Sequence, residues 1–305
     1  MNYLNKWILN LFLICFAGCH SAFAKEVTDE FSDINIQTIE LGNGIYMLMG
    51  KGGNIGVSVG EDGVFMIDDQ FAPLTDKIKV AIAGISDKPL RFVINTHWHF
   101  DHTGGNENLG KEGVVIVAHD NVRERMSKDN FIAAFNKKVP ASPKAALPVI
   151  TFKDAVTFHL NGLDIHVSHQ SNAHTDGDSM VFFNPANVIH MGDTFFNGFY
   201  PFIDASTKGS VNGMIGAAER VLAMVDEKTK IIPGHGPLGD KKALIKYRDM
   251  LVTVRDRMQK LIDQGKTLEE IVALKPNTDV DEVWGKGFLD PEAFLKILHS
   301  AMPKN

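Results

Sequence analysis

The sequence contains very little cysteine. Its 305 residues include only Cys15 and Cys19, both close to the N-terminus. If the N-terminal segment that carries them is removed, the rest of the chain has no thiol. A disulfide framework and a cysteine metal ligand are therefore both excluded for the mature protein.

Basic residues are also scarce relative to acidic ones. The chain has 31 Lys and Arg against 37 Asp and Glu, a formal net charge of −6. It contains no run of like charge, no low-complexity tract and no repeat of solenoid period. Because affinity for nucleic acid depends on clustered Lys and Arg, we expect a small-molecule substrate and no nucleic-acid partner.

Residues 1–24 have the composition of a secretory signal peptide. Lys6 is the only charged residue among them, an apolar stretch runs from Trp7 to Ala17, and small residues precede the end at Ala24. The apolar stretch is too short and wrongly flanked for a stable membrane span. We therefore predict cleavage after Ala24 and an exported, periplasmic protein with no integral span.

A second interpretation of the N-terminus remains open. The sequence FAGC, from Phe16 to Cys19, resembles the cleavage box of bacterial lipoproteins, which usually begins with Leu. In that case an acyl chain on Cys19 would anchor the protein weakly to a membrane.

The remainder, residues 25–305, is predicted to form one domain with a core at about 36–239 and a C-terminal helical segment at about 240–302. Alternating apolar residues predict strand pairs, and apolar residues at helical spacing predict helices between them. The order is strands, helix, strand, helix, repeated once. Strands are expected at 35–50, 55–70, 90–95, 114–118, 155–169 and 178–193, with a short strand in 230–236, and helices at 73–85, from 121, at 211–225 and from 241. Two similar halves predict an α/β fold in which two sheets pack face to face with helices outside.

The stretch HWHFDH, residues 97–102, concentrates three histidines and an aspartate in six positions after a predicted strand. In an extended strand end His97 and His99 point to the same side, while the chain turning into a helix directs Asp101 and His102 toward a second point nearby. Such a loop can hold two metal ions. Imidazole and carboxylate ligands suit Zn²⁺, with Fe and Mn as alternatives.

Three further polar residues, His174, Asp193 and His235, also follow or adjoin predicted strands, where scaffolds display chemistry. Each of them alone is also compatible with a structural role, such as capping a turn. The remaining mature histidines are expected to be satisfied surface or capping groups, namely His119, His159, His166, His169, His190 and His299.

The motif HWHFDH, then His174, then Asp193 after Gly, then PGHG around His235 resembles in order and spacing the metallo-β-lactamase-fold superfamily. That family is dominated by hydrolases with an αββα four-layer sandwich, and the resemblance covers about residues 36–239. It implies two metal ions. The first would be bound by His97, His99 and His174, the second by Asp101, His102 and His235, and Asp193 would bridge the two.

The resemblance also implies hydrolysis by a hydroxide shared between two Zn²⁺ ions, oriented by Asp101 as the catalytic residue. We expect a cyclic amide or ester as substrate, with a β-lactam as the leading candidate. One subclass of zinc β-lactamases carries a cysteine where this chain has Asp193, and three residues later a lysine that binds the drug's carboxylate. This chain has Phe196 there, and Lys51 or Lys208 would have to replace that lysine.

Three other functions remain open at this stage. The bridging aspartate is similar to that of glyoxalase-like thioesterases, and a lactonase would use the same centre. An iron-dependent sulfur dioxygenase or other oxidoreductase shares the fold, and a non-catalytic metal-binding protein would share the ligands.

The aromatic loop from Phe195 to Phe202 either lines a substrate pocket or fills the edge of the sandwich. The oligomeric state is not predicted.

Overall fold

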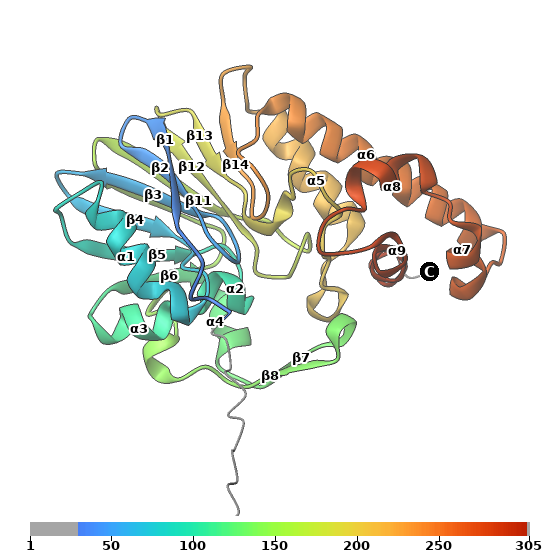
Figure 1. Cartoon of the computed structure of the whole chain (residues 1–305), viewed down its shortest axis with the longest axis horizontal. Helices are drawn as coiled ribbons and strands as arrows, with labels where there is room; N and C mark the ends of the chain where they lie inside the picture. Colours follow the sequence, from blue (N-terminus) through green and yellow to red (C-terminus); the bar gives the residue numbers. More distant parts are fainter. Residues whose placement is uncertain (1–29, 304–305) are drawn as a thin grey trace, which may run out of the picture.

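Two β-sheets pack face to face at the centre of the protein, shown in Figure 1 as a computed structural model that describes residues 30–303. The first sheet has the strand order β1 (Gln37–Gly42), β2 (Ile45–Met49), β3 (Ile55–Gly60), β4 (Gly63–Ile67), β5 (Leu90–Asn95), β6 (Val115–His119) and β9 (Ile150–Phe152). The second has the order β10 (Ala155–Leu160), β11 (Leu163–His169), β12 (Ser179–Asn184), β13 (Val188–His190) and β14 (Lys230–Ile232).

The pairing of the strands follows from the connections between them. Strands β1 to β4 are joined by short turns and pair antiparallel, whereas β4, β5, β6 and β9 pair parallel because helices or long segments connect them. In the second sheet only β13 and β14 are parallel, with α5 between them. The predicted tight turn at Asn161 and Gly162 is confirmed, since both residues have positive φ angles of 55° and 72°.

Helices cover the outer faces of both sheets. On the first sheet lie α1 (Thr75–Ala83), α3 (Asn106–Lys111) and α4 (Asp120–Met126), and on the second lie α5 (Val211–Leu222) and α6 (Lys241–Asp263). Ile78 and Ile82 of α1 share a buried cluster with Val57 and Met66 of the first sheet. The four-layer αββα sandwich predicted from the sequence is confirmed.

The apolar layer between the two sheets is the central core. It contains Phe65 and Ile94 from the first sheet and Ile165, Val181 and Phe183 from the second, all with no more than a trace of exposed surface. Strands β4 and β12 are covered on both faces, so their residues are buried almost without interruption. The two sheets are thereby held in a fixed register, which places their strand ends beside one another.

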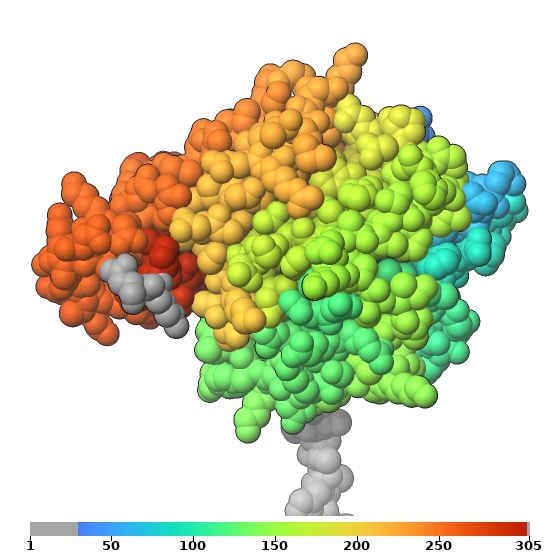
Figure 2. Space-filling model, turned by 180° about the vertical axis from the view of Figure 1, so that it is seen from behind, coloured from blue at the N-terminus to red at the C-terminus, as the bar shows by residue number. Residues whose placement is uncertain are grey.

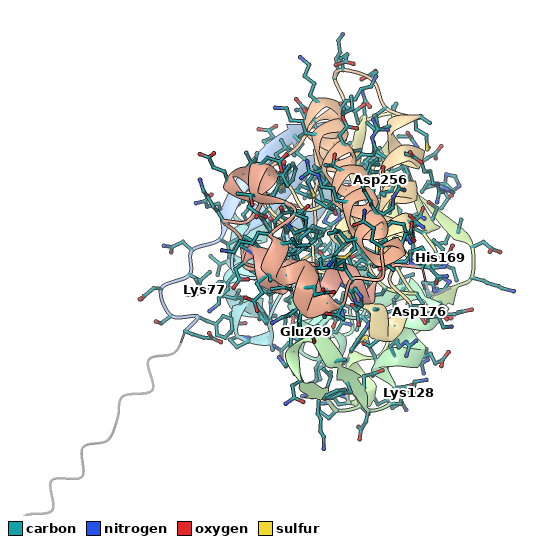
Figure 3. All side chains as sticks on the ribbon, turned by 90° about the vertical axis from the view of Figure 1, so that its right-hand side faces the viewer. Lys77, Lys128, His169, Asp176, Asp256 and Glu269 are labelled. Carbon is teal, nitrogen blue, oxygen red and sulfur yellow. The ribbon has the colours of Figure 1, made fainter. Side chains whose placement is uncertain are left out.

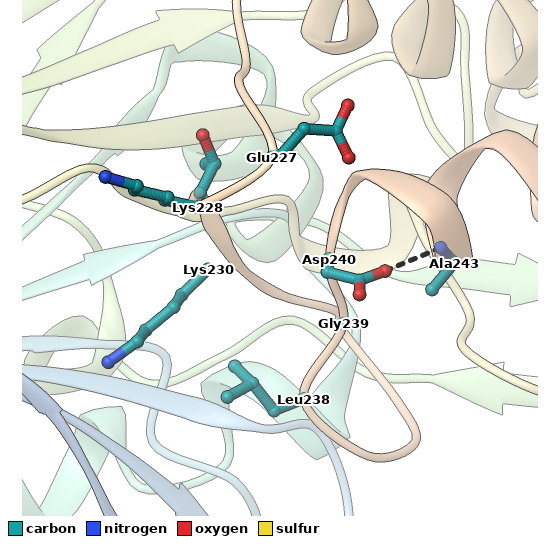
Figure 4. Close-up of a pocket in the computed structure, with 8 residues that line it drawn as sticks. Glu227, Lys228, Lys230, Leu238, Gly239, Asp240 and Ala243 are labelled. Carbon is teal, nitrogen blue, oxygen red and sulfur yellow. Dashed lines mark hydrogen bonds between the residues drawn. The ribbon is translucent and has the colours of Figure 1, made fainter.

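The C-terminal segment consists of four separate helices. After α6 come α7 (Leu268–Leu274), α8 (Thr278–Trp284) and α9 (Pro291–Ser300), and breaks near Gly265, Pro276 and Gly285 separate them. Helix α6 begins after Asp240, whose side chain accepts a hydrogen bond from the Ala243 amide (2.8 Å; Figure 4). The prediction that residues 241–262 form an amphipathic helix over the core is confirmed, since Tyr247 and Leu251 are fully buried.

These helices form one flank of the molecule. They face the viewer in Figure 3, where Asp256 marks α6 and Glu269 marks α7, and they appear in orange and red at the side of the space-filling view in Figure 2. No helix within residues 30–303 is long and apolar enough to cross a bilayer. The predicted signal peptide at residues 1–24 and the residue Cys19 lie outside the described part of the chain.

The segment from 130 to 152, expected in part as a plain surface connection, carries three short strands instead. β7 (Asn130–Ile132) and β8 (Lys137–Val139) form a separate hairpin, and β9 adds to the edge of the first sheet beside β6. Three-residue strands with exposed side chains produce no detectable alternation, which is why the sequence pattern did not reveal them. The hairpin extends below α9 in Figure 1.

Candidate metal centre

All seven predicted site residues lie together at one edge of the sandwich. The loop after β5 supplies His97 and His99, and the short helix α2 (Phe100–Thr103) that follows it supplies Asp101 and His102. The other three come from segments of the second sheet: His174 precedes β12, Asp193 follows β13 and His235 follows β14. Their potential ligand atoms form two groups, and within each group the atoms lie within 4.8 Å of one another. The first group is His97, His99, His174 and Asp193, and the second is Asp101, His102 and His235.

The Asp193 carboxylate lies between the two groups. Its Oδ1 is 3.0 Å from His102 Nε2, and its Oδ2 is 3.5 Å from both His174 Nε2 and His235 Nε2. The same Oδ2 is 3.8 Å from His97 Nε2. One carboxylate therefore faces ligands of both groups, which is the position that a bridging residue requires.

Two of the imidazoles are oriented by groups behind them. His174 Nδ1 donates to the carbonyl oxygen of Phe202 (2.9 Å), and His99 Nε2 faces the Asp204 carboxylate (3.2 Å). Because a carbonyl and a carboxylate only accept, each neutral ring keeps its proton on that side and its lone pair on the other nitrogen. Those lone pairs, on His174 Nε2 and His99 Nδ1, face each other at 2.8 Å.

The other pair is oriented by a buried aspartate, Asp68. His102 Nδ1 donates to Asp68 Oδ2 (2.7 Å), which also accepts the hydroxyl proton of Thr96 (2.7 Å). The Thr96 oxygen is then free to accept from His97 Nδ1 (3.0 Å). The lone pairs on Nε2 of His97 and His102 consequently point into the cluster.

The donor set fits a metal centre. Facing lone pairs repel unless a proton or a cation lies between them, and His97 Nε2 is buried with no hydrogen-bond partner among the described residues. Carboxylate or carbonyl groups behind metal-binding imidazoles are a regular feature of such sites, because they fix the tautomer. These nitrogen and oxygen ligands suit Zn²⁺, Fe or Mn, and the structure does not select among them.

The charges inside the cluster are strongly coupled. Burial alone would raise the pKa of Asp193, but the neighbouring histidines, led by His102, hold it well below its usual range. Burial alone would lower the pKa of His235, but Asp193 and Asp101 raise it to about 9. Protons on these imidazoles therefore compete with cations for the same carboxylates, so metal binding releases protons.

The glycine loop after β2 packs directly against the centre. Gly53 donates its amide to the Asp101 carbonyl (3.0 Å) and accepts from the Gln70 side chain (2.7 Å). A Cβ atom on Gly53 would overlap the His102 ring. The loop is thus a tightly packed wall of the site.

Asn54 connects this wall to the loop that carries His235. Its side-chain amide donates to the carbonyl oxygens of Pro233 and Gly236 (both 2.9 Å), and its backbone amide donates to Gly234 (2.7 Å). These three bonds hold the backbone on both sides of His235. Its side chain is 21% exposed, more than that of any other predicted histidine ligand. Asn54 therefore positions a loop far from it in sequence.

The remaining histidines occupy structural positions. His119 accepts from the Asn121 amide and caps α4, as expected, whereas His159 is exposed on β10 and His166 is half-buried on β11. His190 differs from the expectation of a surface or capping role: it is fully buried, bonded to the Asn54 carbonyl (3.0 Å) and the Gly192 amide (3.1 Å). A buried strand position with both ring nitrogens satisfied explains the difference.

The aromatic loop fills the edge of the sandwich and also contacts the centre. Phe195 packs on Tyr247 (5.2 Å between ring centroids) and Tyr200 stacks on Phe294 (3.8 Å), so these rings join the sandwich to the C-terminal helices. Phe196 instead stacks on the ligand candidate His235 (5.3 Å), and Phe202 lies 5.7 Å from His99. One part of the loop fills the edge, and the other part surrounds the centre.

Asp68 and Asp204 were not identified from the sequence. Asp68 follows β4, directly beside β5 in the same sheet, so the rule that polar residues at strand ends carry chemistry could have found it. Asp204 lies in an irregular segment that has no such signal. Its side chain is 2% exposed, and although burial raises the pKa of Asp204, hydrogen bonding with His99 lowers it to about 2.

Comparison with known families agrees with this geometry. The family model of the metallo-β-lactamase superfamily matches residues 49–240, more than half of the chain. The protein is therefore a member of the metallo-β-lactamase superfamily, whose members are metal-dependent hydrolases.

Curated relatives are similar at low identity. They include the acyl-coenzyme A thioesterase MBLAC2 of Homo sapiens (24% identical, 48% of this chain and 56% of the relative) and a hydroxyacylglutathione hydrolase of Polaromonas sp. (28%, 53% and 55%). A probable metallo-hydrolase of Methanocaldococcus jannaschii is 27% identical over 65% of this chain and 89% of its own. This chain spans a little over half the length of the first two.

Solved structures share the fold. The DIM-1 metallo-β-lactamase aligns with a TM-score of 0.58 at 20% identity, over 73% of this chain and all of its own. The sec-alkylsulfatase Pisa1 from Pseudomonas sp. aligns with a TM-score of 0.63 at 16% identity, over 87% of this chain and half of its own.

We predict that Gly53→Ala will displace the His102 ring and lower kcat/KM by about 100-fold, since a shift of about 1 Å in a catalytic group has an effect of that size. Gly216→Ala is the matched control, because Gly216 lies within α5 with open space around it. Zinc content and turnover are measured for both variants. Full activity of Gly53→Ala would contradict the conclusion that the close packing of Gly53 against the His102 ring is needed for activity.

We also predict that Asp68→Asn will weaken metal binding by about 10- to 100-fold, the usual cost of losing a carboxylate behind a metal-binding imidazole. Competition with a chromogenic chelator measures the affinity. Asp226→Asn, a surface substitution outside the centre, should leave it unchanged. Equal affinities of the two variants would show that Asp68 does not orient His102.

Proposed function

We propose that this protein hydrolyses an acyl bond, in a thioester or ester, with two divalent cations held by the seven residues of the candidate centre. One observation supports this proposal: imidazole lone pairs and two carboxylates converge in a single cluster that comprises both groups of ligands. One cation would be held by His97, His99 and His174. The other would be held by Asp101, His102 and His235, and Asp193 would contact both cations.

The charge of such a centre suits a polarised substrate. Two divalent cations carry +4 and the two aspartates return −2, so the centre keeps a positive charge that attracts a carbonyl oxygen or an anion. Cations bound there lower the pKa of water toward neutrality and polarise a carbonyl group. The low pKa of Asp193 keeps its carboxylate ionised as a ligand.

In this proposal Asp101 orients the attacking water. Its side chain is 22% exposed, against 5% for Asp193, and its Oδ2 lies 3.2 Å from His235 Nε2. His102 and His235 hold the pKa of Asp101 below its usual range although burial raises it. The carboxylate is therefore an acceptor at neutral pH, on the open side of the centre.

The substrate class rests on two observations. First, curated relatives matched by sequence are a thioesterase and hydroxyacylglutathione hydrolases. Second, the two lysines considered as anchors for a β-lactam carboxylate are engaged elsewhere: Lys51 pairs with Glu30 (2.8 Å) and Lys208 lies 3.9 Å from Asp176. Phe196 is buried against His235, so the position three residues after Asp193 offers no cation to that carboxylate.

These observations favour thioesters and esters over the β-lactam that the sequence motifs placed first. A sulfur dioxygenase remains the alternative from another reaction class, since the same ligands also suit iron. The features of residues 1–24 support export of the enzyme to the periplasm.

The proposal is tested with a panel of thioester, aryl ester, lactone and β-lactam substrates, with zinc, iron and manganese measured on the same sample. We expect thioester or ester hydrolysis that a chelator abolishes and Zn²⁺ restores. One iron per chain with oxygen consumption and no hydrolysis would replace the proposal with oxidation. Efficient β-lactam cleavage alone would overturn the substrate class.

Asp101→Asn should lower kcat by about 100-fold or more with little change in KM, because it removes a group that acts on the attacking water. Because Asp101 is also a proposed ligand of the second cation, turnover is measured at saturating Zn²⁺ and the metal content per chain is determined on the same sample. A variant with intact kcat would show that Asp101 has no catalytic role.

A further inference from the structure

A large cavity lies beside the metal centre, between the β7–β8 hairpin, the segment after the aromatic loop and α9. Its volume is about 990 Å³, at the upper end of the range of small-molecule pockets, about 300–1,000 Å³. Its lining includes Phe135 from the hairpin, Phe202 and Ile203 from the loop, and Phe288 and Ile297 from the C-terminal segment.

The cavity and the metal centre share a wall. Phe202 lines the cavity, its ring lies 5.6 Å from His174, and its carbonyl oxygen accepts the His174 proton. Asp204 also lines the cavity and bonds to His99 (3.2 Å). A ligand in the cavity would therefore contact the segment that orients two of the predicted metal ligands.

The lining suits an apolar and uncharged occupant. Phe135 and Phe288 are 41% and 63% exposed, an uncommon state for large aromatic rings that face each other at 5.7 Å. Alanines at 134 and 293 leave space beside the rings. The charged residues of the lining are already engaged, since Lys296 pairs with Glu292 (2.7 Å).

Asp290 and Asp204 add negative charge to the same wall. Asp290 accepts from the Ala293 amide and caps α9, while Asp204 bonds to His99 and to the Thr207 hydroxyl. Two carboxylates without an unpaired cation beside them disfavour an anionic occupant. The group that fits this cavity is an aliphatic chain.

The hairpin is fastened to the metal centre rather than loosely attached. Lys137 Nζ lies 3.4 Å from the centroid of the Phe100 ring, which is part of the HWHFDH motif, and Phe135 contacts Phe202 (4.7 Å). The opposite wall, residues 288–300, lies outside the part of the chain that the family model matches. The cavity is thus completed by a segment beyond the family's shared core.

We propose that this cavity binds the aliphatic acyl chain of the substrate, so that the C-terminal helices select medium- and long-chain acyl compounds. The inference rests on the proposed function, because it places the scissile carbonyl at the metal centre and the chain against Phe135, Phe202 and Phe288. Each buried methylene strengthens such binding, so kcat/KM should rise about two- to fourfold per added methylene until the cavity is filled.

The test uses zinc-loaded full-length protein and a series of acyl thioesters from acetyl to dodecanoyl. The double variant Phe135→Ser, Phe288→Ser removes two exposed rings of the lining. Phe131→Ser is the matched control, because Phe131 lies on the same hairpin, is 48% exposed and does not line the cavity.

We expect the double variant to lose at least about tenfold in kcat/KM for dodecanoyl substrate and less than twofold for acetyl substrate. The control variant should match the wild type on both. An unchanged dependence on chain length in the double variant would overturn the proposal, as would a wild type that hydrolyses acetyl and dodecanoyl substrates equally well.

A binding measurement separates this proposal from the proposed function. Dodecanoate and acetate are titrated calorimetrically into the zinc-loaded wild type and variants, which needs no turnover. The carboxylate of either ligand is expected at the cations of the centre, so that only the aliphatic chain of dodecanoate enters the cavity. Dodecanoate binding that weakens at least tenfold only in the double variant supports the cavity even if no thioester is hydrolysed, in which case the proposed function alone fails. Dodecanoate that does not bind the wild type, or binds the double variant equally well, overturns the acyl-chain site.

Discussion

The centre depends on one constraint: four imidazole rings must turn their lone pairs toward a common point, although unshielded lone pairs repel. Each ring is held in that orientation from behind, by Asp68, Thr96, Asp204 or the carbonyl oxygen of Phe202. These groups are buried, so their alternative hydrogen bonds with water are lost and the tautomer of each ring is determined. Cations relieve the repulsion, and the site is therefore organised for a metal before one binds.

The two sheets contribute to this constraint in different ways. The first sheet supplies the motif loop after β5 and, from the end of β4, the aspartate that orients two of its rings. The second supplies His174, Asp193 and His235 from three separate strand ends. Because the apolar layer between the sheets fixes their register, the Asp193 carboxylate meets ligands of both groups. The packing of the core thus determines the distances between ligands of the two sheets, which the sequence around each ligand cannot determine.

Apolar groups surround the centre on the side of the hairpin and the C-terminal helices. Phe196 covers His235 at the position where one subclass of zinc β-lactamases carries a lysine, and the hairpin and C-terminal helices enclose an apolar cavity behind Phe202. A centre of one composition can serve many reactions, and the groups that contact the rest of the substrate select among them. The lining of this cavity comes in part from the hairpin and residues 202–206, which the family model covers, and in part from residues 288–300, which lie outside the matched region.

The motif residues and the alternation of short strands were enough to predict the sandwich and the membership of the family. Rules that relate near neighbours in sequence are reliable for these features. His97 and His99 are two residues apart, and the tight turn at Asn161 and Gly162 depends on the backbone preferences of those two residues. The roles of Asp68, Asp204 and Asn54, the β7–β8 hairpin and the cavity were decided by tertiary structure alone. They arise from contacts between residues separated by as many as 182 positions, as between Asn54 and Gly236, and sequence spacing holds no information about which distant groups the packing of two sheets will bring together.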